Sequence, residues 1–106
     1  MKDATFGGYL ATHDRPPAFA GRDGRAYSAD LWVDDVPDAD GRLGGAFVFI
    51  RWNHAGDAPD GHLESAYLAF GSDRASVEAQ LKGLDLHAVK EALDAAVARA
   101  AELGDW

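Results

Sequence analysis

Hydrophobic and polar residues alternate clearly along two stretches of the chain. In residues 26–34 every odd-numbered position from Tyr27 to Val33 is apolar, and apart from Trp32 the positions between them are polar. This two-residue period predicts a half-buried strand. Residues 46–52 (AFVFIRW) are apolar on both faces and are bounded by Gly45 and Asn53. That pattern is typical of a central strand.

Two further segments have weaker strand patterns. Residues 5–12 (TFGGYLAT) predict a first strand, in which Gly7 and Gly8 mark a bulge or a close backbone approach. Residues 63–70 (LESAYLAF) place apolar side chains on both faces and predict a fourth strand. The segments between the four strands are rich in Asp, Gly and Pro, which predicts turns and loops.

From residue 73 onward the apolar spacing changes from two residues to three or four. Val77 and Leu81 follow a candidate N-cap at residues 72–73, which predicts a short helix over residues 73–82. Gly83 fits a left-handed residue at the end of that helix. A longer amphipathic helix is predicted over residues 86–103, with Asp85 as its cap.

Strands that precede helices in this order predict an α+β fold. We expect an antiparallel sheet of about four strands, with both helices packed on one face. A length of 106 residues favours one domain spanning residues 1–106. The pattern leaves open whether Phe47 and Phe49 or Val48 and Ile50 face the helices. The expected core consists of Phe6, Leu31, Val33, Phe49, Tyr67, Val77, Leu81, Val89, Leu93 and Val97.

The charge composition argues against several classes of partner. A formal net charge of −8, with basic residues scattered singly, disfavours binding to nucleic acid or to an anionic membrane surface. The chain has no cysteine, which excludes disulfides and thiolate metal sites. It has no apolar stretch of membrane-spanning length, so we expect a cytoplasmic protein.

The densest polar cluster lies in and around the loop of residues 53–62. His54, Asp57, Asp60 and His62 are weak candidates for the ligands of a divalent metal ion, but their spacing matches no established motif. A solvated loop is the simpler interpretation, and we predict no metal and no cofactor. An alternative function is a small-molecule-binding domain or small enzyme with a His/Asp site near residues 53–64, where a histidine acts as acid or base.

The sheet has more apolar surface than two helices can cover. The face away from the helices either lies beneath the N-terminal segment around Pro16, Pro17 and Phe19 or forms a binding surface. No catalytic motif competes with the second interpretation. We therefore expect a non-catalytic protein-binding or accessory module that self-associates as a dimer through an aromatic sheet face. The candidate interface residues are Trp32, Val48, Ile50, Trp52, Leu68 and Phe70.

Overall fold

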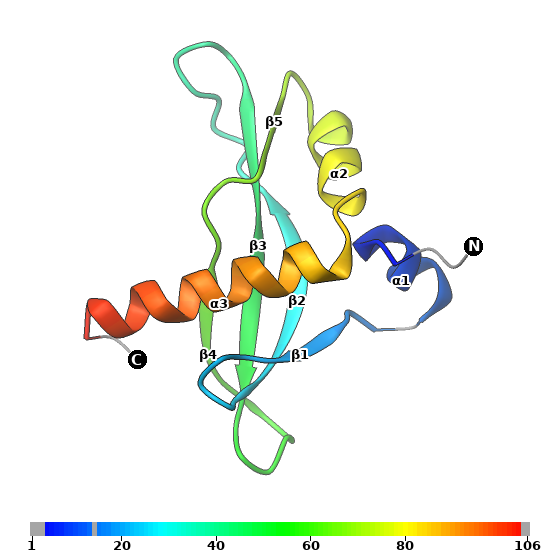
Figure 1. Cartoon of the computed structure of the whole chain (residues 1–106). Coiled ribbons are helices and arrows are strands. Elements are labelled where there is room, and N and C mark those ends of the chain that lie inside the picture. The colour runs from blue at the N-terminus through cyan, green and yellow to red at the C-terminus, as the bar shows by residue number, and fades with distance from the viewer. Residues whose placement is uncertain (1–3, 14, 105–106) are drawn as a thin grey trace.

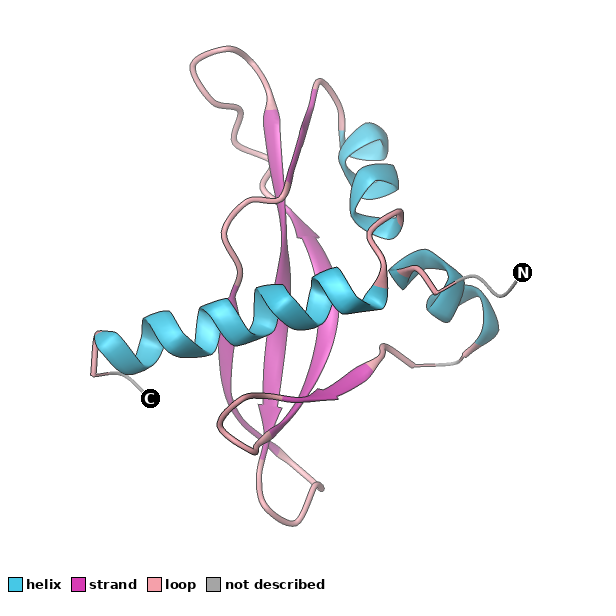
Figure 2. Cartoon of the chain, viewed as in Figure 1, coloured by secondary structure: helices cyan, strands magenta, loops and turns pink. Residues whose placement is uncertain are grey.

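The computed structural model of the chain describes residues 4–13 and 15–104. These residues form an antiparallel sheet and three helices, which confirms the predicted α+β fold (Figures 1 and 2). The strand order is β1-β2-β3-β4, and β5 pairs with another part of β3. The elements are α1 (Phe6–Thr12), β1 (Ala18–Ala20), β2 (Ala26–Val33), β3 (Leu43–Trp52), β4 (Pro59–Glu64), β5 (Ala69–Gly71), α2 (Arg74–Lys82) and α3 (Leu86–Glu102).

The register of β2 against β3 decides which face of the sheet is buried. Ala29 lies opposite Phe49, and Leu31 lies opposite Phe47. Because side chains alternate along a strand, the apolar positions of β2 share a face with the two phenylalanines. The helices cover this face, so the question that the sequence left open is settled in favour of Phe47 and Phe49.

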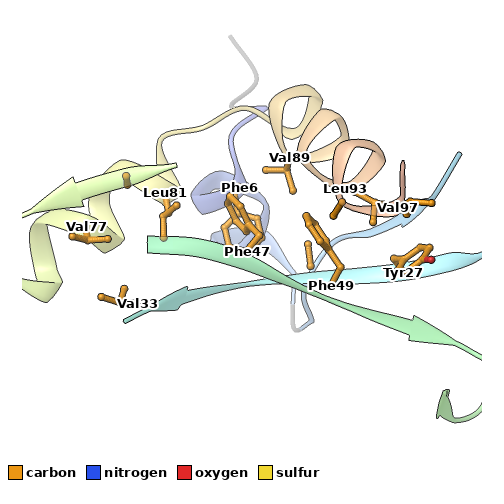
Figure 3. Close-up of a cluster of buried hydrophobic side chains, with 13 residues drawn as sticks. Phe6, Tyr27, Val33, Phe47, Phe49, Val77, Leu81, Val89, Leu93 and Val97 are labelled. Atoms are coloured by element: carbon orange, nitrogen blue, oxygen red, sulfur yellow. The ribbon is translucent and has the colours of Figure 1, made fainter. Parts of the chain in front are cut away.

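The buried core lies between this face and the helices (Figure 3). The ring of Phe6, from α1, packs edge-on against Phe47 with centroids 4.9 Å apart. Of the predicted core residues, Leu31 is only partly buried. The prediction of Tyr67 as a core residue is wrong, because Tyr67 is 44% exposed. The remaining eight predicted core residues are buried: Phe6, Val33, Phe49, Val77, Leu81, Val89, Leu93 and Val97.

The strand predicted over residues 5–12 is wrong, because this segment forms helix α1. Thr5 caps the helix, and its Oγ1 accepts a hydrogen bond of 3.0 Å from the Gly8 amide. Gly7 is required where α1 meets α2, since a Cβ at this position would lie 2.9 Å from the Cβ of Lys82. Its glycine therefore marks a close approach of two helices, not a strand bulge.

Backbone hydrogen bonds fasten the start of α1 to the link between α2 and α3. The Phe6 amide donates to the Leu84 carbonyl, and the Leu86 amide donates to the Ala4 carbonyl, each at 2.8 Å. Thr5 and Asp85 form an isolated antiparallel bridge between these two bonds. The N-terminal helix is thus held by the C-terminal third of the chain.

The strand predicted over residues 63–70 is divided in two. Strand β4 begins earlier, at Pro59, and ends at Glu64, whereas β5 covers only Ala69–Gly71. The two strands pair with different halves of β3. The link between them still touches β3, because the Ser65 amide donates to the Phe47 carbonyl at 2.9 Å.

The short strand β1 was not predicted. It follows Pro16-Pro17 and pairs with the start of β2.

Strand β3 extends through a segment that was predicted to be a turn. It begins at Leu43 and includes Gly44 and Gly45. A Cβ on Gly45 would lie 2.3 Å from Cγ1 of Val77 in α2, and a Cβ on Gly44 would lie 2.9 Å from the ring of Tyr67. The glycine pair therefore lets a helix approach one face of β3 and an aromatic ring approach the other.

Both C-terminal helices are present as predicted. Asp73 and Asp85 act as N-caps, with their carboxylates accepting from the amides of Ser76 and Ala88. The left-handed conformation predicted for Gly83 is wrong, since its φ of −78° is that of an ordinary helical residue. Helix α3 crosses the strands on the buried face, and in Figure 1 its C-terminal part continues past β4. In the described ranges, no helix is long and apolar enough to cross a membrane.

Candidate protein-binding surface

The helices all pack on one face of the sheet and leave the other face uncovered by any described helix. Figure 3 shows Phe6, Leu81 and Val89 on the same side of the sheet as Phe47 and Phe49. We call the opposite side the open face. The alternation of β2 and β3 and the pairing of Phe70 with Gly44 assign five of the candidate interface residues to it, namely Trp32, Val48, Ile50, Trp52 and Phe70.

These side chains are partly accessible to solvent. Trp32 is 38% exposed and Phe70 is 41% exposed, whereas Val48 and Ile50 are half-buried. The sixth candidate, Leu68, lies in the link between β4 and β5 and is 43% exposed. The sequence pattern thus grouped five of the six residues on one face.

An aromatic cluster forms one end of the open face and consists of Trp32, Tyr67 and Phe70. The ring of Tyr67 lies 6.3 Å from that of Trp32, centroid to centroid, and 5.9 Å from that of Phe70. The guanidinium of Arg42 lies over the Phe70 ring at 5.0 Å, where it is attracted by the electron-rich ring face. Sequence reasoning placed Tyr67 in the core and therefore missed the centre of this cluster.

Tyr67 is held in the cluster by Asp34. Its hydroxyl donates a hydrogen bond of 2.5 Å to Oδ2 of Asp34. This bond, with a second bond from the Val36 amide, lowers the pKa of Asp34 below its ordinary value. The same bond raises the pKa of Tyr67, and burial and the negative charges of Asp34 and Glu64 raise it further. The phenol therefore stays protonated, and the carboxylate stays ionised, over the neutral pH range.

Carboxylates flank the middle of the open face. Asp30 of β2 and Glu64 of β4 both lie opposite Val48 of β3. One position along, Ile50 lies between Ser28 and His62. The central strand is therefore apolar on this face, while the strands on either side carry polar and acidic groups.

The other end of the open face has a shallow hollow beside Trp52. The indole Nε1 of Trp52 donates to Oγ of Ser28 at 3.1 Å. The hollow has a volume of about 390 Å³. Among the described residues its lining contains no histidine and no carboxylate, and consists of Arg15, Pro16, Ala18, Ala26, Ser28, Trp52 and Gly56.

The described part of the N-terminal segment, residues 4–13 and 15–20, does not cover the open face as a lid. Residues 18–20 instead extend the sheet by pairing with β2. Phe19 packs against the buried core, and Pro17 is itself buried. Pro16 borders the hollow beside Trp52, and Trp32 and its aromatic neighbours remain accessible.

The four weak metal candidates are not brought together. Asp60 is held between two arginines, accepting from Nη2 of Arg25 at 2.7 Å and from Nε of Arg51 at 2.8 Å. The hydrogen bond from Arg51, and to a smaller extent the bond from Arg25, lower the pKa of Asp60 below its ordinary value. Asp57 instead exchanges two hydrogen bonds with Asn53, which closes the loop.

The two histidines are both exposed to solvent. His54 is exposed in the loop, and His62 is exposed on β4. Across residues 4–13 and 15–104, no group of three or more metal-ligating side chains is gathered at one place. In the described part of the chain, residues 53–64 therefore contain no cluster of the size that holds a metal ion.

The open face combines apolar, aromatic and acidic side chains on one side of the sheet. Its apolar strand, aromatic cluster and carboxylates lie together on one side of the sheet. Likeness to known proteins adds nothing to this picture, since the chain matches no family model, no curated protein and no solved structure.

Proposed function

We propose that this chain is a non-catalytic protein-binding module that self-associates through its open face. The observation that carries the proposal is the group of partly exposed apolar side chains on one side of β2, β3 and β5, with no described helix over them. Contiguous apolar surface of this kind marks interaction sites in water-soluble domains. Trp, Tyr and Phe are also enriched in the centres of protein interfaces.

Trp32 is the residue from which we expect the largest contribution. A tryptophan side chain buries up to about 250 Å², and 38% of Trp32 is still exposed. Covering that part removes roughly 90 Å² from water, which is worth about 2 kcal/mol at about 25 cal/mol/Å². A two-fold dimer covers Trp32 of both copies, so the two side chains together contribute about 4 kcal/mol, which corresponds to roughly 10³-fold in the dissociation constant.

The charges of the open face are compatible with a second copy of the chain. Arg42 lies at the aromatic end and Arg15 at the hollow end, whereas Asp30 and Glu64 lie between them. In a two-fold contact the same surface meets itself in the opposite direction. When the two-fold axis lies between Arg42 and these carboxylates, Arg42 of each copy approaches the carboxylates of the other, which offsets the repulsion between two chains of net charge −8.

Sedimentation equilibrium over a wide concentration range tests self-association. We expect a dimer whose dissociation constant rises roughly 10³-fold in Trp32→Thr, because both copies lose the ring. Threonine keeps the strand preference of this position while removing the ring. Leu103→Thr is the matched control, because Leu103 is 70% exposed but lies after α3 and away from the open face. A monomer at every concentration, or equal effects of both variants, would contradict the proposal.

The hollow beside Trp52 supports small-molecule binding as a second candidate function. Its volume of about 390 Å³ is within the range of ligand pockets, roughly 300–1,000 Å³. The Trp52 indole offers a flat apolar wall, and Arg15 offers a positive charge. A thermal-shift screen with small aromatic carboxylates is the test. A rise in melting temperature that disappears in Trp52→Leu would support this function, whereas no rise with any compound would contradict it.

A further inference from the structure

A groove lies between the edge of β4 and the C-terminal part of α3. β4 is the last strand on its side of the sheet, and α3 crosses over it and continues beyond it (Figure 1). The groove has a volume of about 230 Å³. Its lining combines apolar and polar side chains from both elements, namely His62, Leu63, Glu64, Ala96, Arg99, Ala100 and Leu103.

The backbone of β4 offers hydrogen-bonding groups to this groove. The Ser65 amide donates to β3, and in an antiparallel pair the amide and carbonyl of alternate residues face the same neighbour. The backbone groups of Leu63 therefore point toward β3, and those of His62 and Glu64 point outward. An outward edge of this kind is a template for an added strand.

Helix α3 provides a cover for such a strand. The helix rises about 1.5 Å per residue, so Leu103 lies about 10 Å beyond Ala96 along its axis. That distance is about two strand spacings of 4.8 Å. Ala96 is buried near β4, whereas Leu103 is 70% exposed beyond the sheet edge. A strand paired to β4 would therefore lie beneath the projecting, partly apolar end of the helix.

Arg99 limits where the added strand ends. Nη2 of Arg99 donates a hydrogen bond of 3.0 Å to the Glu64 carbonyl. Along the edge of β4, this carbonyl is the next outward acceptor after that of His62. Among the described residues Arg99 forms no ion pair, although the chain carries a net charge of −8. A strand that reaches this guanidinium meets a positive charge and an occupied carbonyl.

We propose that this groove binds the C-terminal end of an extended peptide from another protein. The peptide pairs with the outward groups of His62 and the Glu64 amide, running parallel to β4, and Arg99 binds its terminal carboxylate. An apolar side chain near that end packs between Leu63 and Ala100. His62 and Glu64 border both surfaces, but the groove uses the outward backbone of β4 and the α3 side of the sheet, so this inference does not rest on self-association.

A second copy of β4 is a poorer occupant than a peptide. In a two-fold pairing of β4 strands centred on Leu63, both copies of α3 would cross the same point on the same face of the combined sheet. A helix with its side chains is about 10 Å wide, so the two helices would collide. A peptide brings no helix and leaves the space beneath α3 free.

Titration of the full chain with short peptides, followed by amide NMR, tests the proposal. The probes are acetylated Thr-Val-Thr-X peptides, with X being Val, Leu, Ile or Phe, made with a free C-terminal carboxylate or with an amide. We expect at least one acid peptide to shift the amide signals of His62, Glu64 and Arg99. We also expect its amide form to bind at least about tenfold more weakly than the acid form.

Variants and a modified peptide separate binding from folding. Arg99→Gln should weaken the acid peptide about tenfold and abolish the preference for acid over amide. The control Arg22→Gln changes an exposed arginine on the other side of α3 and should leave the affinity unchanged. Methylating the peptide nitrogens that face β4 should abolish binding without altering the protein.

Three results would overturn the inference. The first is the absence of shifts at His62 and Glu64 with every peptide at millimolar concentration. The second is equal binding of acid and amide forms, which would remove the role of Arg99. The third is a doubled molecular mass that the peptides reverse while Trp32→Thr does not, which would make a second copy the occupant of this edge.

Discussion

Gly45 is the position where one added methyl group should most disturb the packing of helix on sheet. An alanine Cβ there would lie 2.3 Å from Cγ1 of Val77 and 2.9 Å from Cδ1 of Leu81. Both of those side chains are fully buried and have no room to retreat. Gly45 does not have a positive φ, so the cost of Gly45→Ala comes from the steric conflict alone.

The magnitude follows from the cost of overfilling a core. An extra methylene in a well-packed interior destabilises by about 1–3 kcal/mol, and a contact of 2.3 Å favours the upper end of this range. Gly83→Ala is the matched control, because its Cβ would meet only backbone oxygens at 3.4 and 3.5 Å. There we expect no loss of stability, or a gain of up to about 1 kcal/mol from reduced freedom of the unfolded chain.

A double-mutant cycle shows whether Val77 is the cause. Val77→Ala alone removes two buried methyl groups and should cost about 2 kcal/mol. In the double variant the methyl group added at position 45 occupies part of the vacated space. The double variant should therefore lose less free energy of unfolding than the two single variants together. We expect the difference to be at least about 1 kcal/mol.

Urea unfolding followed by circular dichroism measures the parent and all of these variants. Domains of this size are stable by about 5–15 kcal/mol, so a loss of about 2–3 kcal/mol shifts the midpoint clearly. A Gly45→Ala protein as stable as the parent would refute the close packing of α2 on β3. Strict additivity in the cycle would show that the conflict does not involve Val77.

Two further predictions concern the side-chain hydrogen bonds of Tyr67 and Asp60. Tyr67→Phe removes the donor to Asp34, so the lowered pKa of Asp34 should return toward its ordinary value. In the parent protein, the lowered pKa of Asp34 contributes stability above about pH 4, which is lost as the pH falls through that pKa. In Tyr67→Phe this contribution should be smaller, so acid-unfolding curves should show a weaker dependence of stability on pH. Asp60→Asn weakens the ion pairs with Arg25 and Arg51. It should lower the thermal midpoint at low salt, less than Gly45→Ala does, and the difference should shrink in about 1 M salt.

The sequence predicted the elements whose periodicity is set by local burial. The alternation of residues 26–34 and the helical spacing of residues 86–103 correspond closely to β2 and α3. Helix α1 was missed because its glycines were interpreted as features of a strand. Gly7 is explained only by Lys82, 75 positions later, and no local pattern contains that contact. The helical signal that was available is Thr5 as a cap followed by Phe6 and Leu10 four residues apart.

The open face was predictable in its membership but not in its orientation. Strand alternation assigned Val48 and Ile50 to one side of β3, whereas the pairing of Ala29 with Phe49 decided which side the helices cover. Tyr67 was placed on the wrong side because residues 65–68 leave strand geometry between β4 and β5. Once the regular alternation is interrupted, the parity of a residue no longer predicts the face on which it lies.

The hydrogen bonds between the start of α1 and the α2–α3 link also set the order in which a growing chain can complete its core. Phe6 is made early, but its amide bonds to Leu84 and its ring packs on Phe47. Ribosomes add about 5–20 residues per second, so the 78 positions from Phe6 to Leu84 take roughly 4–16 seconds. During that time the α1 segment waits in the nascent chain without its partner. The Phe6 ring is therefore made well before the residues that complete its burial.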